Sequence, residues 1–299
     1  MSAKTVGFVG LGVMGLPMAR NVIRGGHAVV GFDLNPVVLE ELAAADGRVV
    51  DSAAAAARGS DVAITMVPNP EDVEAALLGP DGVADGIEGD AVVVVMSTVD
   101  PPSAIRVHDR LQERDIRMIE APVTRSSQHA IDGELGILVG GEAEDLEAAR
   151  PVLECMGTDI THCGPIGTGS AMKLVNNMLA MTIQTVTGEA LAYGLKAGLS
   201  LETLHEVLGG TAASNPALHG PMKKVAKRFF EPGFMVRLGQ KDLRLAVKYA
   251  SELGAMTHLG SVTHQMLAQA NARGYGAEDT SAVAKLYEEA AGVQIREGS

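Results

Sequence analysis

The sequence has no tryptophan, and aromatic residues make up only 3% of its 299 positions. Platforms that stack nucleic-acid bases and aromatic walls that bind sugars depend on such side chains, so both are largely excluded. The longest uninterrupted apolar run, residues 91–96, is far too short to cross a bilayer. The first residues also lack the apolar stretch of a signal peptide, and we expect a cytoplasmic protein that does not bind membranes.

Cysteine and positive charge are scarce as well. The two cysteines, Cys155 and Cys163, form no CxxC pair, which is typical of thiols in a reducing compartment. The eight histidines include no HExxH motif, and no metal site is expected. With 24 basic against 37 acidic residues the formal net charge is −13, and such a field repels phosphate backbones. Nucleic acid is therefore not an expected partner.

In the first half of the chain, short β-branched runs alternate with helical stretches. Strands are predicted over residues 5–9, 28–32, 62–67, 91–96, 116–119 and 136–139. Helices are predicted over residues 14–24, 36–45, 71–78, 101–114 and 142–156. The run 91–96 is apolar at every position, as a strand covered by helices on both sides must be. This alternation predicts an α/β domain with a doubly wound, mainly parallel sheet.

Beyond residue 165 the strand signal disappears. Residues 168–197 contain no proline and carry apolar residues at helical spacing, which predicts one long helix. Further helices are predicted over residues 201–208, 221–230, 241–253, 261–273 and 281–290. We therefore expect a nucleotide-binding domain over residues 1–164, and an all-helical domain over residues 165–299 that the long helix joins to it.

A glycine-rich turn follows the first predicted strand and opens the first helix. Its pattern is GxGxxG (Gly10, Gly12, Gly15): the first glycine permits a tight turn, the second the approach of a pyrophosphate, the third close helix–strand packing. The helix N-terminus offers free N–H groups to phosphates. The sequence thus predicts a Rossmann domain that binds a dinucleotide through the whole turn: Gly10, Leu11, Gly12, Val13, Met14 and Gly15.

Asp33 ends the second predicted strand, where an acid accepts hydrogen bonds from ribose hydroxyls. It would repel a 2′-phosphate, and no arginine follows it, so NAD is favoured over NADP. The alternative is a solvated acid at a strand end.

Gly169, Lys173 and Asn177 follow one another at intervals of four residues, so they share one face of the predicted long helix. Removing hydride from an alcohol carbon requires loss of the O–H proton, and a lysine of lowered pKa can accept it. A solvated lysine near a helix start is the alternative. Phe234 and the pair Lys241-Asp242, which opens a predicted helix, are further candidates on the substrate side. Spacing alone would indicate only an apolar anchor and a surface pair.

Residues 120–127 leave a predicted strand at its carboxyl end, where ligands of α/β proteins bind. Arg125 beside Ser126 and Ser127 suits a planar or tetrahedral anion, although an ordinary surface loop also uses these residue types.

Taken together, these motifs resemble the β-hydroxyacid dehydrogenases. The resemblance rests on the following segments: Gly7-Phe-Val-Gly-Leu-Gly-Val-Met-Gly15, Ala121-Pro-Val123, Gly133-Glu-Leu, Val139-Gly-Gly141, Gly169-Ser-Ala-Met-Lys173-Leu-Val-Asn-Asn177 and Lys241-Asp-Leu243. It implies a Rossmann domain followed by an all-helical domain, in homodimers or homotetramers. It also implies that Lys173 is catalytic and that Asn177 orients the substrate hydroxyl.

The same resemblance implies further contacts. Val67, Pro68 and Thr98 would border the cofactor, and Lys241 would reach its nicotinamide end. Ser97 would lie beside the substrate. The substrate's acid group would be held by Thr124, Arg125, Ser126, Ser127 and Asn176.

One departure concerns the substrate. The family's usual Ser-Gly-Gly is replaced by Thr124-Arg125-Ser126, and an arginine there resembles the sulfolactaldehyde reductase branch. That branch has glycine in place of Thr124 and serine in place of Ala180. We predict an NAD-dependent enzyme that interconverts a small anionic β-hydroxy acid and its semialdehyde, where the acid group is a carboxylate or a sulfonate. Of the two, the arginine favours the sulfonate, with sulfolactaldehyde as the substrate. One alternative is 3-hydroxyisobutyrate dehydrogenase activity, and another is a non-catalytic NAD(H) sensor. A third is imine reduction, which the presence of Lys173 disfavours.

Overall fold

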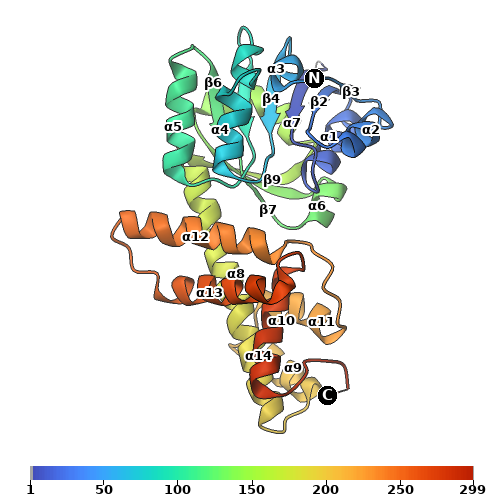
Figure 1. Ribbon diagram of the computed structural model, residues 1–299, viewed down its shortest axis with the longest axis vertical. Helices are drawn as coiled ribbons and strands as arrows, with labels where there is room; N and C mark the ends of the chain where they lie inside the picture. The colour runs from blue at the N-terminus through green and yellow to red at the C-terminus, as the bar shows by residue number, and fades with distance from the viewer. Residues whose placement is uncertain (1–2, 299) are drawn as a thin grey trace. The chain divides into compact units, whose positions relative to one another are not determined.

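The computed structural model describes residues 3–298, and the chain forms two compact units, Met1–Lys173 and Leu174–Ser299. The first unit contains every strand of the described residues, and the second is built from helices (Figure 1). A long helix, α8 (Thr168–Lys196), begins in the first unit and ends in the second.

The first unit is organised around one sheet with the strand order β3-β2-β1-β4-β5-β6-β8-β7, and β9 pairs with β8. The strands are β1 (Thr5–Val9), β2 (Ala28–Phe32), β3 (Arg48–Val49), β4 (Val62–Thr65), β5 (Val92–Val95), β6 (Arg117–Glu120), β7 (Val123–Thr124), β8 (Leu135–Gly140) and β9 (Gly157–Gly164). Strands β1 to β6 pair in parallel, while β8 runs antiparallel to β6 and β7. The predicted doubly wound, mainly parallel sheet is confirmed. Its order reverses between β1 and β4, the position at which such sheets bind ligands.

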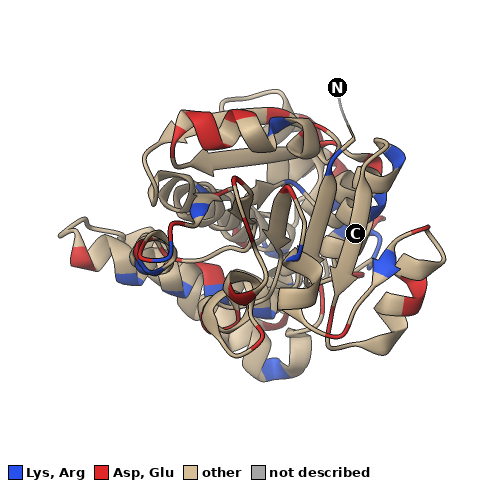
Figure 2. Cartoon of the chain, turned by 90° about the horizontal axis from the view of Figure 1, so that it is seen from above, with Lys and Arg blue, Asp and Glu red and all other residues tan. Residues whose placement is uncertain are grey.

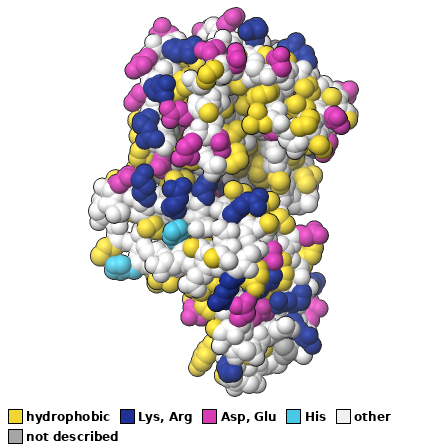
Figure 3. All heavy atoms as spheres, in the orientation of Figure 1, with side chains coloured by type: hydrophobic (Ala, Val, Ile, Leu, Met, Phe, Trp, Pro, Cys, Tyr) yellow, Lys and Arg dark blue, Asp and Glu magenta, His cyan; other side chains and the backbone are white. Residues whose placement is uncertain are grey.

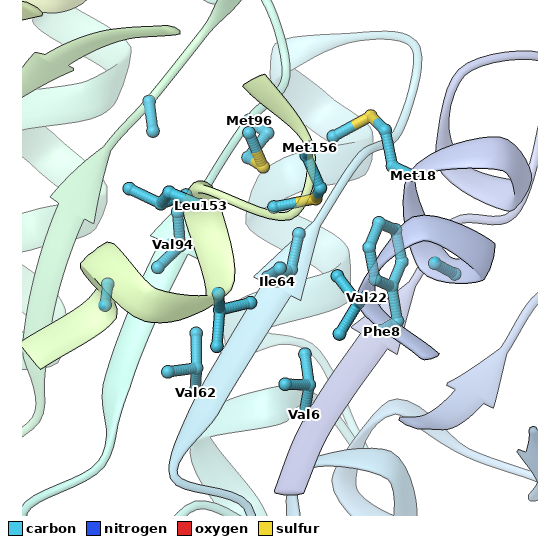
Figure 4. Packing of buried hydrophobic residues seen from close by; sticks show 14 of the residues in the cluster. Val6, Phe8, Met18, Val22, Val62, Ile64, Val94, Met96, Leu153 and Met156 are labelled. Atoms are coloured by element: carbon cyan, nitrogen blue, oxygen red, sulfur yellow. The ribbon is translucent and has the colours of Figure 1, made fainter. Parts of the chain in front are cut away.

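Helices cover this sheet, and each face has its own apolar core. The helices are α1 (Gly15–Arg24), α2 (Pro36–Ala43), α3 (Ala53–Ala57), α4 (Pro70–Leu78), α5 (Pro101–Gln112), α6 (Ser127–Asp132) and α7 (Ala143–Leu153), with a 3₁₀ turn at Val83–Asp85. In β5, Val92 and Val94 enter one core while Val93 and Val95 enter the other. Figure 4 shows the first core, where Phe8 and Ile64 of the sheet lie near Met18 of α1 and Leu153 of α7. Burial on both faces explains the all-apolar run that the sequence shows here.

Several elements of the first unit were not predicted: β3, β7, β9, α3 and α6. The longest of them, β9, is an edge strand whose residues from Thr158 to Gly164 are all exposed or partly exposed. It therefore lacks the apolar run or alternation by which a strand is recognised in sequence. Helix α3 consists of five alanines, and the Ser52 side chain caps it by accepting from the Ala55 N–H.

The second unit contains α9 (Leu201–Gly209), α10 (Pro216–His219), α11 (Pro221–Ala226), α12 (Val236–Glu252), α13 (His258–Ala270) and α14 (Ala284–Ala291). A π-type turn at Asn271–Tyr275 and a 3₁₀ turn at Thr280–Val283 precede α14. Helix α12 starts at Val236 rather than at the predicted residue 241, and α10 was not predicted. Phe234, just before α12, packs against a buried cluster that includes Val236 and Leu243, in agreement with the predicted anchor.

Acidic and basic residues are interspersed along the ribbon of the helices in Figure 2. No helix within residues 3–298 combines the length and apolar character that crossing a bilayer requires. Both cysteines are free thiols, and the described residues hold no group of three or more His, Cys, Asp or Glu side chains suited to a metal ion.

Candidate active site

The glycine turn after β1 uses its three glycines in different ways. Gly10 has φ +92°, and a Cβ atom there would overlap the carbonyl oxygen of Met66. A Cβ atom at Gly15 would overlap the Gly10 carbonyl oxygen, so this glycine lets α1 start directly against the turn. A Cβ atom at Gly12 would meet no atom within 4 Å, and the residue is exposed. The protein itself leaves space above Gly12, which fits a pyrophosphate that approaches the N-terminus of α1.

Asp33 follows β2 and binds the same turn. Its Oδ2 accepts a hydrogen bond of 2.6 Å from the Leu11 N–H, and its Oδ1 accepts one of 2.8 Å from the Asn35 N–H. Each carboxylate oxygen can accept two hydrogen bonds, so these contacts are compatible with ribose hydroxyls as additional donors. The sequence predicts only the ribose contact, and the structure adds that Asp33 holds the glycine turn in place.

Two predicted residues of the neighbouring strands also meet here. The Val67 N–H after β4 donates to the Ser97 hydroxyl after β5 at 2.9 Å, and Ser97 is 1% exposed. A Cβ atom at Gly10 would lie 2.9 Å from Cγ1 of Val67. Pro68 is exposed and Thr98 partly exposed. The structure thus brings the glycine turn and the ends of β4 and β5 together at the point where the strand order reverses.

The loop at Thr124–Ser127 is shaped by hydrogen bonds within the first unit. Arg125 adopts φ +77°, and its guanidinium pairs with the Asp159 carboxylate, the Glu134 carbonyl oxygen and, at 3.1 Å, the Thr158 hydroxyl. These partners lie on or beside β8 and β9.

The hydroxyl residues that flank Arg125 have local partners as well. Thr124 donates to the Gly136 carbonyl oxygen at 3.3 Å, and the Ser126 hydroxyl lies 2.9 Å from Nδ1 of His129. Ser126 and His129 form the capping box of α6, whose first residue is Ser127.

Lys173 lies in the second turn of α8 and is only 8% exposed, unlike a solvated lysine. A Cβ atom at Gly169 would lie 2.6 Å from the Leu138 carbonyl oxygen and 2.8 Å from the Gly140 nitrogen. Gly169 therefore allows the first turn of α8 to pack directly on β8. This close approach fixes the start of the helix that carries Lys173.

In the second unit, α8 and α12 share a buried polar cluster. Asn177 Nδ2 donates to Asp242 Oδ2 at 2.7 Å, and Asn176 Nδ2 donates to Asn177 Oδ1 at 3.1 Å. Asp242 Oδ1 lies 3.2 Å from the Lys241 ammonium. Because a carboxylate only accepts hydrogen bonds, it fixes which side of the Asn177 amide carries the NH₂ group.

Lys241 and Asp242 do not form the surface pair that spacing alone would indicate. Asp242 is 1% exposed, and the Lys241 side chain is 13% exposed. Both lie inside α12, and the buried face of that helix carries Asp242 toward α8. Arg237, Lys241, Arg244 and Lys248 recur at helical spacing along α12. Figure 3 shows basic side chains in a row across this region.

Comparisons with known proteins cover almost the whole chain. Residues 5–164 match the family described as the NAD binding domain of 6-phosphogluconate dehydrogenase. Residues 167–287 match the family described as the NAD-binding domain of NADP-dependent 3-hydroxyisobutyrate dehydrogenase.

Individual relatives agree with these matches. The chain is 37% identical to an NAD-dependent L-serine dehydrogenase of Pseudomonas aeruginosa, over 95% of this chain and 98% of the relative. It is 34% identical to the 3-sulfolactaldehyde reductase of Escherichia coli, over 97% and 98% of the two chains. The structure of Mycobacterium tuberculosis 3-hydroxyisobutyrate dehydrogenase with L-serine superimposes with a TM-score of 0.89 at 34% identity, covering 95% of this chain and 99% of that one.

The predicted fold, the predicted NAD chemistry and the two family matches agree with one another. NAD(P) binding is further supported by the open space above Gly12 at the start of α1. The chain is an NAD-dependent oxidoreductase that belongs to the β-hydroxyacid dehydrogenase family.

Proposed function

We propose that the chain oxidises the hydroxyl group of a small anionic β-hydroxy acid to the semialdehyde and catalyses the reverse reduction. The observation that carries this proposal is the burial of Lys173, at 8% exposure, four residues before Asn177 on α8. A lysine that is largely withdrawn from solvent can exchange a proton with the hydroxyl of a bound substrate. Asn177, 6% exposed and held by Asp242, supplies an amide of defined orientation.

In this proposal, bound NAD supplies the hydride acceptor. Lys173 Nζ takes the proton of the substrate hydroxyl during oxidation and returns it during reduction. Asn177 orients that hydroxyl, and Asn176 with the residues of the Thr124–Ser127 loop binds the acid group. Ser97, Thr98, Val67 and Pro68 border the nicotinamide region, and Lys241 reaches it from α12.

NAD is proposed as the preferred cofactor because of Asp33. Its carboxylate accepts from the backbone of the glycine turn, and it would face the 2′-phosphate of NADP at close range. A like-charge contact of this kind in a partly desolvated site costs on the order of a few kcal/mol.

For the substrate we take carboxylic semialdehydes first. The guanidinium of Arg125 pairs with the carboxylate of Asp159, and the Thr124 hydroxyl donates to the Gly136 carbonyl oxygen, so we expect an incoming acid to meet chiefly the serine hydroxyls of the loop. Among the relatives, L-serine and 3-hydroxyisobutyrate are substrates of this carboxylate class by name. Sulfolactaldehyde is the second candidate, and the arginine in the loop favours it, because a sulfonate can engage several donors from different directions.

We also propose a homodimer or homotetramer. In the second unit, α8 exposes Val175, Leu179, Val186 and Tyr193, with Tyr193 at 75% exposure. A row of exposed apolar side chains along one face of a helix favours burial of that face against another chain. Light scattering on the purified protein measures the number of copies, and a monomer at micromolar concentration would contradict this part of the proposal.

The proposed chemistry is tested by Lys173→Ala. We expect kcat to fall by roughly 10²–10⁴ while the Kd of NADH stays unchanged, because a proton acceptor acts on the chemical step. Lys196→Ala is the matched control, since Lys196 is an exposed lysine at the other end of the same helix. Near-native turnover of Lys173→Ala would place the proton transfer elsewhere.

A substrate panel tests the specificity. NADH oxidation is followed with methylmalonate, tartronate and succinate semialdehydes and with sulfolactaldehyde, and NAD reduction with L-serine and 3-hydroxyisobutyrate. We expect the highest kcat/KM with a short carboxylic substrate. No turnover with any of them would favour a non-catalytic sensor.

A further inference from the structure

Glu120 is a fully buried acid that the proposed reaction does not use. It is the last residue of β6 and has 0% exposure. Its strand neighbours are Val95 of β5 and Gly140 of β8, so its carboxylate lies in the interior of the sheet domain. Burying an ionisable group without function is costly, and such groups are retained where specific donors compensate them.

The donors that compensate Glu120 come from the start of α8. The Ser170 N–H donates to Glu120 Oε1 at 3.1 Å, and the Ser170 hydroxyl donates to Oε2. Burial raises the pKa of Glu120, while hydrogen bonds from Ser170 and from the backbone N–H groups of Gly167 and Gly169 oppose that rise. All these groups are donors, and the ionised carboxylate is the form that can accept from every one of them.

The other N–H groups at the start of α8 have partners of their own. The Thr168 N–H donates to the Pro165 carbonyl oxygen at 3.1 Å, and the Ala171 N–H donates to the Gly167 carbonyl oxygen at 3.0 Å. Helix N-termini leave several backbone donors without intrahelical partners, and here Glu120 accepts those of the first turn.

The space around this contact is closed. A Cβ atom at Gly140 would overlap Glu120 Oε1 and would lie 2.9 Å from the Gly169 nitrogen. The first turn of α8 therefore cannot slide or rotate on β8 without breaking its contacts with the carboxylate.

We propose that Glu120 is a positioning residue: its carboxylate fixes the height and rotation of the first turn of α8, and thereby sets the position of Lys173. Ser170 precedes Lys173 by three residues, less than one helical turn, so a shift of the bound turn is passed to the Lys173 side chain through rigid backbone. This inference rests on the proposed role of Lys173. A misplacement of about 1 Å at a catalytic group can cost about 10²-fold in rate.

The test is a double-mutant cycle between Glu120→Gln and Lys173→Ala. The glutamine keeps the volume of the side chain, but it turns one acceptor oxygen into a donor that faces other donors. We expect Glu120→Gln alone to lower kcat by roughly 10- to 100-fold with the KM of NADH unchanged. In the Lys173→Ala background the same change should lower kcat by less than about twofold, because no positioned lysine is left to disturb.

Two further variants keep the test decisive. Ser170→Ala removes only the hydroxyl donor, and we expect a fall in kcat of roughly threefold to tenfold that again disappears in the Lys173→Ala background. If Glu120→Gln does not fold, this cycle replaces it. Asp145→Asn is the matched control: Asp145 is a buried acid, 7% exposed, that pairs with Arg117 at the opposite end of β6. It should lower the Tm and leave kcat unchanged.

Full kcat in folded Glu120→Gln, or an equal fall of kcat in both backgrounds, would overturn the positioning role. Failure of the proposed function is seen separately, as native turnover in the Lys173→Ala single variant. That outcome would overturn the positioning role together with the proposed reaction.

Discussion

Two loops at strand ends of the sheet domain differ in what shapes them. The glycine turn after β1 is determined by its own backbone: Gly10 needs its positive φ, and Gly15 needs the absence of a side chain. The Thr124–Ser127 loop is determined by side chains that pair with distant residues, above all Arg125 with Asp159 on β9. A loop of the first kind can be predicted from local sequence, because glycines stand at the positions where the backbone geometry requires them. A loop of the second kind cannot, because its partners are known only once the strands are placed.

A large loss of stability is expected of Gly15→Ala in the glycine turn. The new Cβ would overlap the Gly10 carbonyl oxygen, and backbone cannot give way as a flexible side chain does. Overpacking typically costs about 1–3 kcal/mol, and we expect the upper end, with a fall in Tm of about 10 °C. Calorimetry measures it, and an unchanged Tm would show that the turn is less constrained than its backbone suggests.

Gly12→Ala is the matched change without a steric conflict in the protein. The added methyl meets no atom within 4 Å, so we expect the Tm to stay within about 1 °C of the native value. A pyrophosphate that approaches the backbone would meet the methyl, and the Kd of NADH should rise at least about tenfold. Titration calorimetry with NADH checks this. If NADH affinity is native, the cofactor does not pass over Gly12.

Asp33 links the turn to cofactor choice. For the native protein we expect kcat/KM with NAD to exceed that with NADP more than about tenfold, and Asp33→Ser should narrow or reverse the ratio. The serine also loses the contact with the Leu11 N–H, so both affinities are expected to fall, and the ratio is the informative quantity. Equal efficiency of the native protein with the two cofactors would contradict the assignment.

How much of the site the sequence predicts follows the same division. The positions of the main strands, the glycine turn and the long helix can be predicted from the sequence, because apolar runs, glycines and helical spacing are local signals. Strand β9 gives no such signal, because it lies at an exposed edge. The burial of Asp242 cannot be predicted from its spacing, because charge normally indicates exposure. Glu120 is a second charged residue whose burial the sequence does not show. Nothing in the local sequence of β6 indicates that its partner is Ser170, fifty positions further along the chain.

The smallest expected effect is that of Arg125→Gly. This variant tests whether the arginine of the Thr124–Ser127 loop pairs only with other residues of the protein or also binds the substrate. The Arg125 side chain is 36% exposed and that of Asp159 62% exposed, and exposed ion pairs contribute at most about 1 kcal/mol. Glycine removes the pair and the exposed hydrogen bonds to Glu134 and Thr158, but it also relieves a left-handed conformation that costs a non-glycine residue roughly 1–2 kcal/mol. The two terms nearly cancel, and we expect the Tm to change by no more than about 2 °C.

The kinetic outcome separates the two substrate classes. With Arg125 engaged by Asp159, the KM for carboxylic semialdehydes should stay within about threefold of the native value in Arg125→Gly. Asp159→Asn is the control, since it loosens the arginine without removing it, and it should leave that KM unchanged as well. A rise in KM for sulfolactaldehyde of more than about tenfold in Arg125→Gly alone would mean that the guanidinium leaves Asp159 to bind the anion, because removing one partner of a desolvated charge pair costs roughly 2–5 kcal/mol. In that case the sulfonate becomes the first candidate, and the pairing with Asp159 describes the enzyme without its substrate.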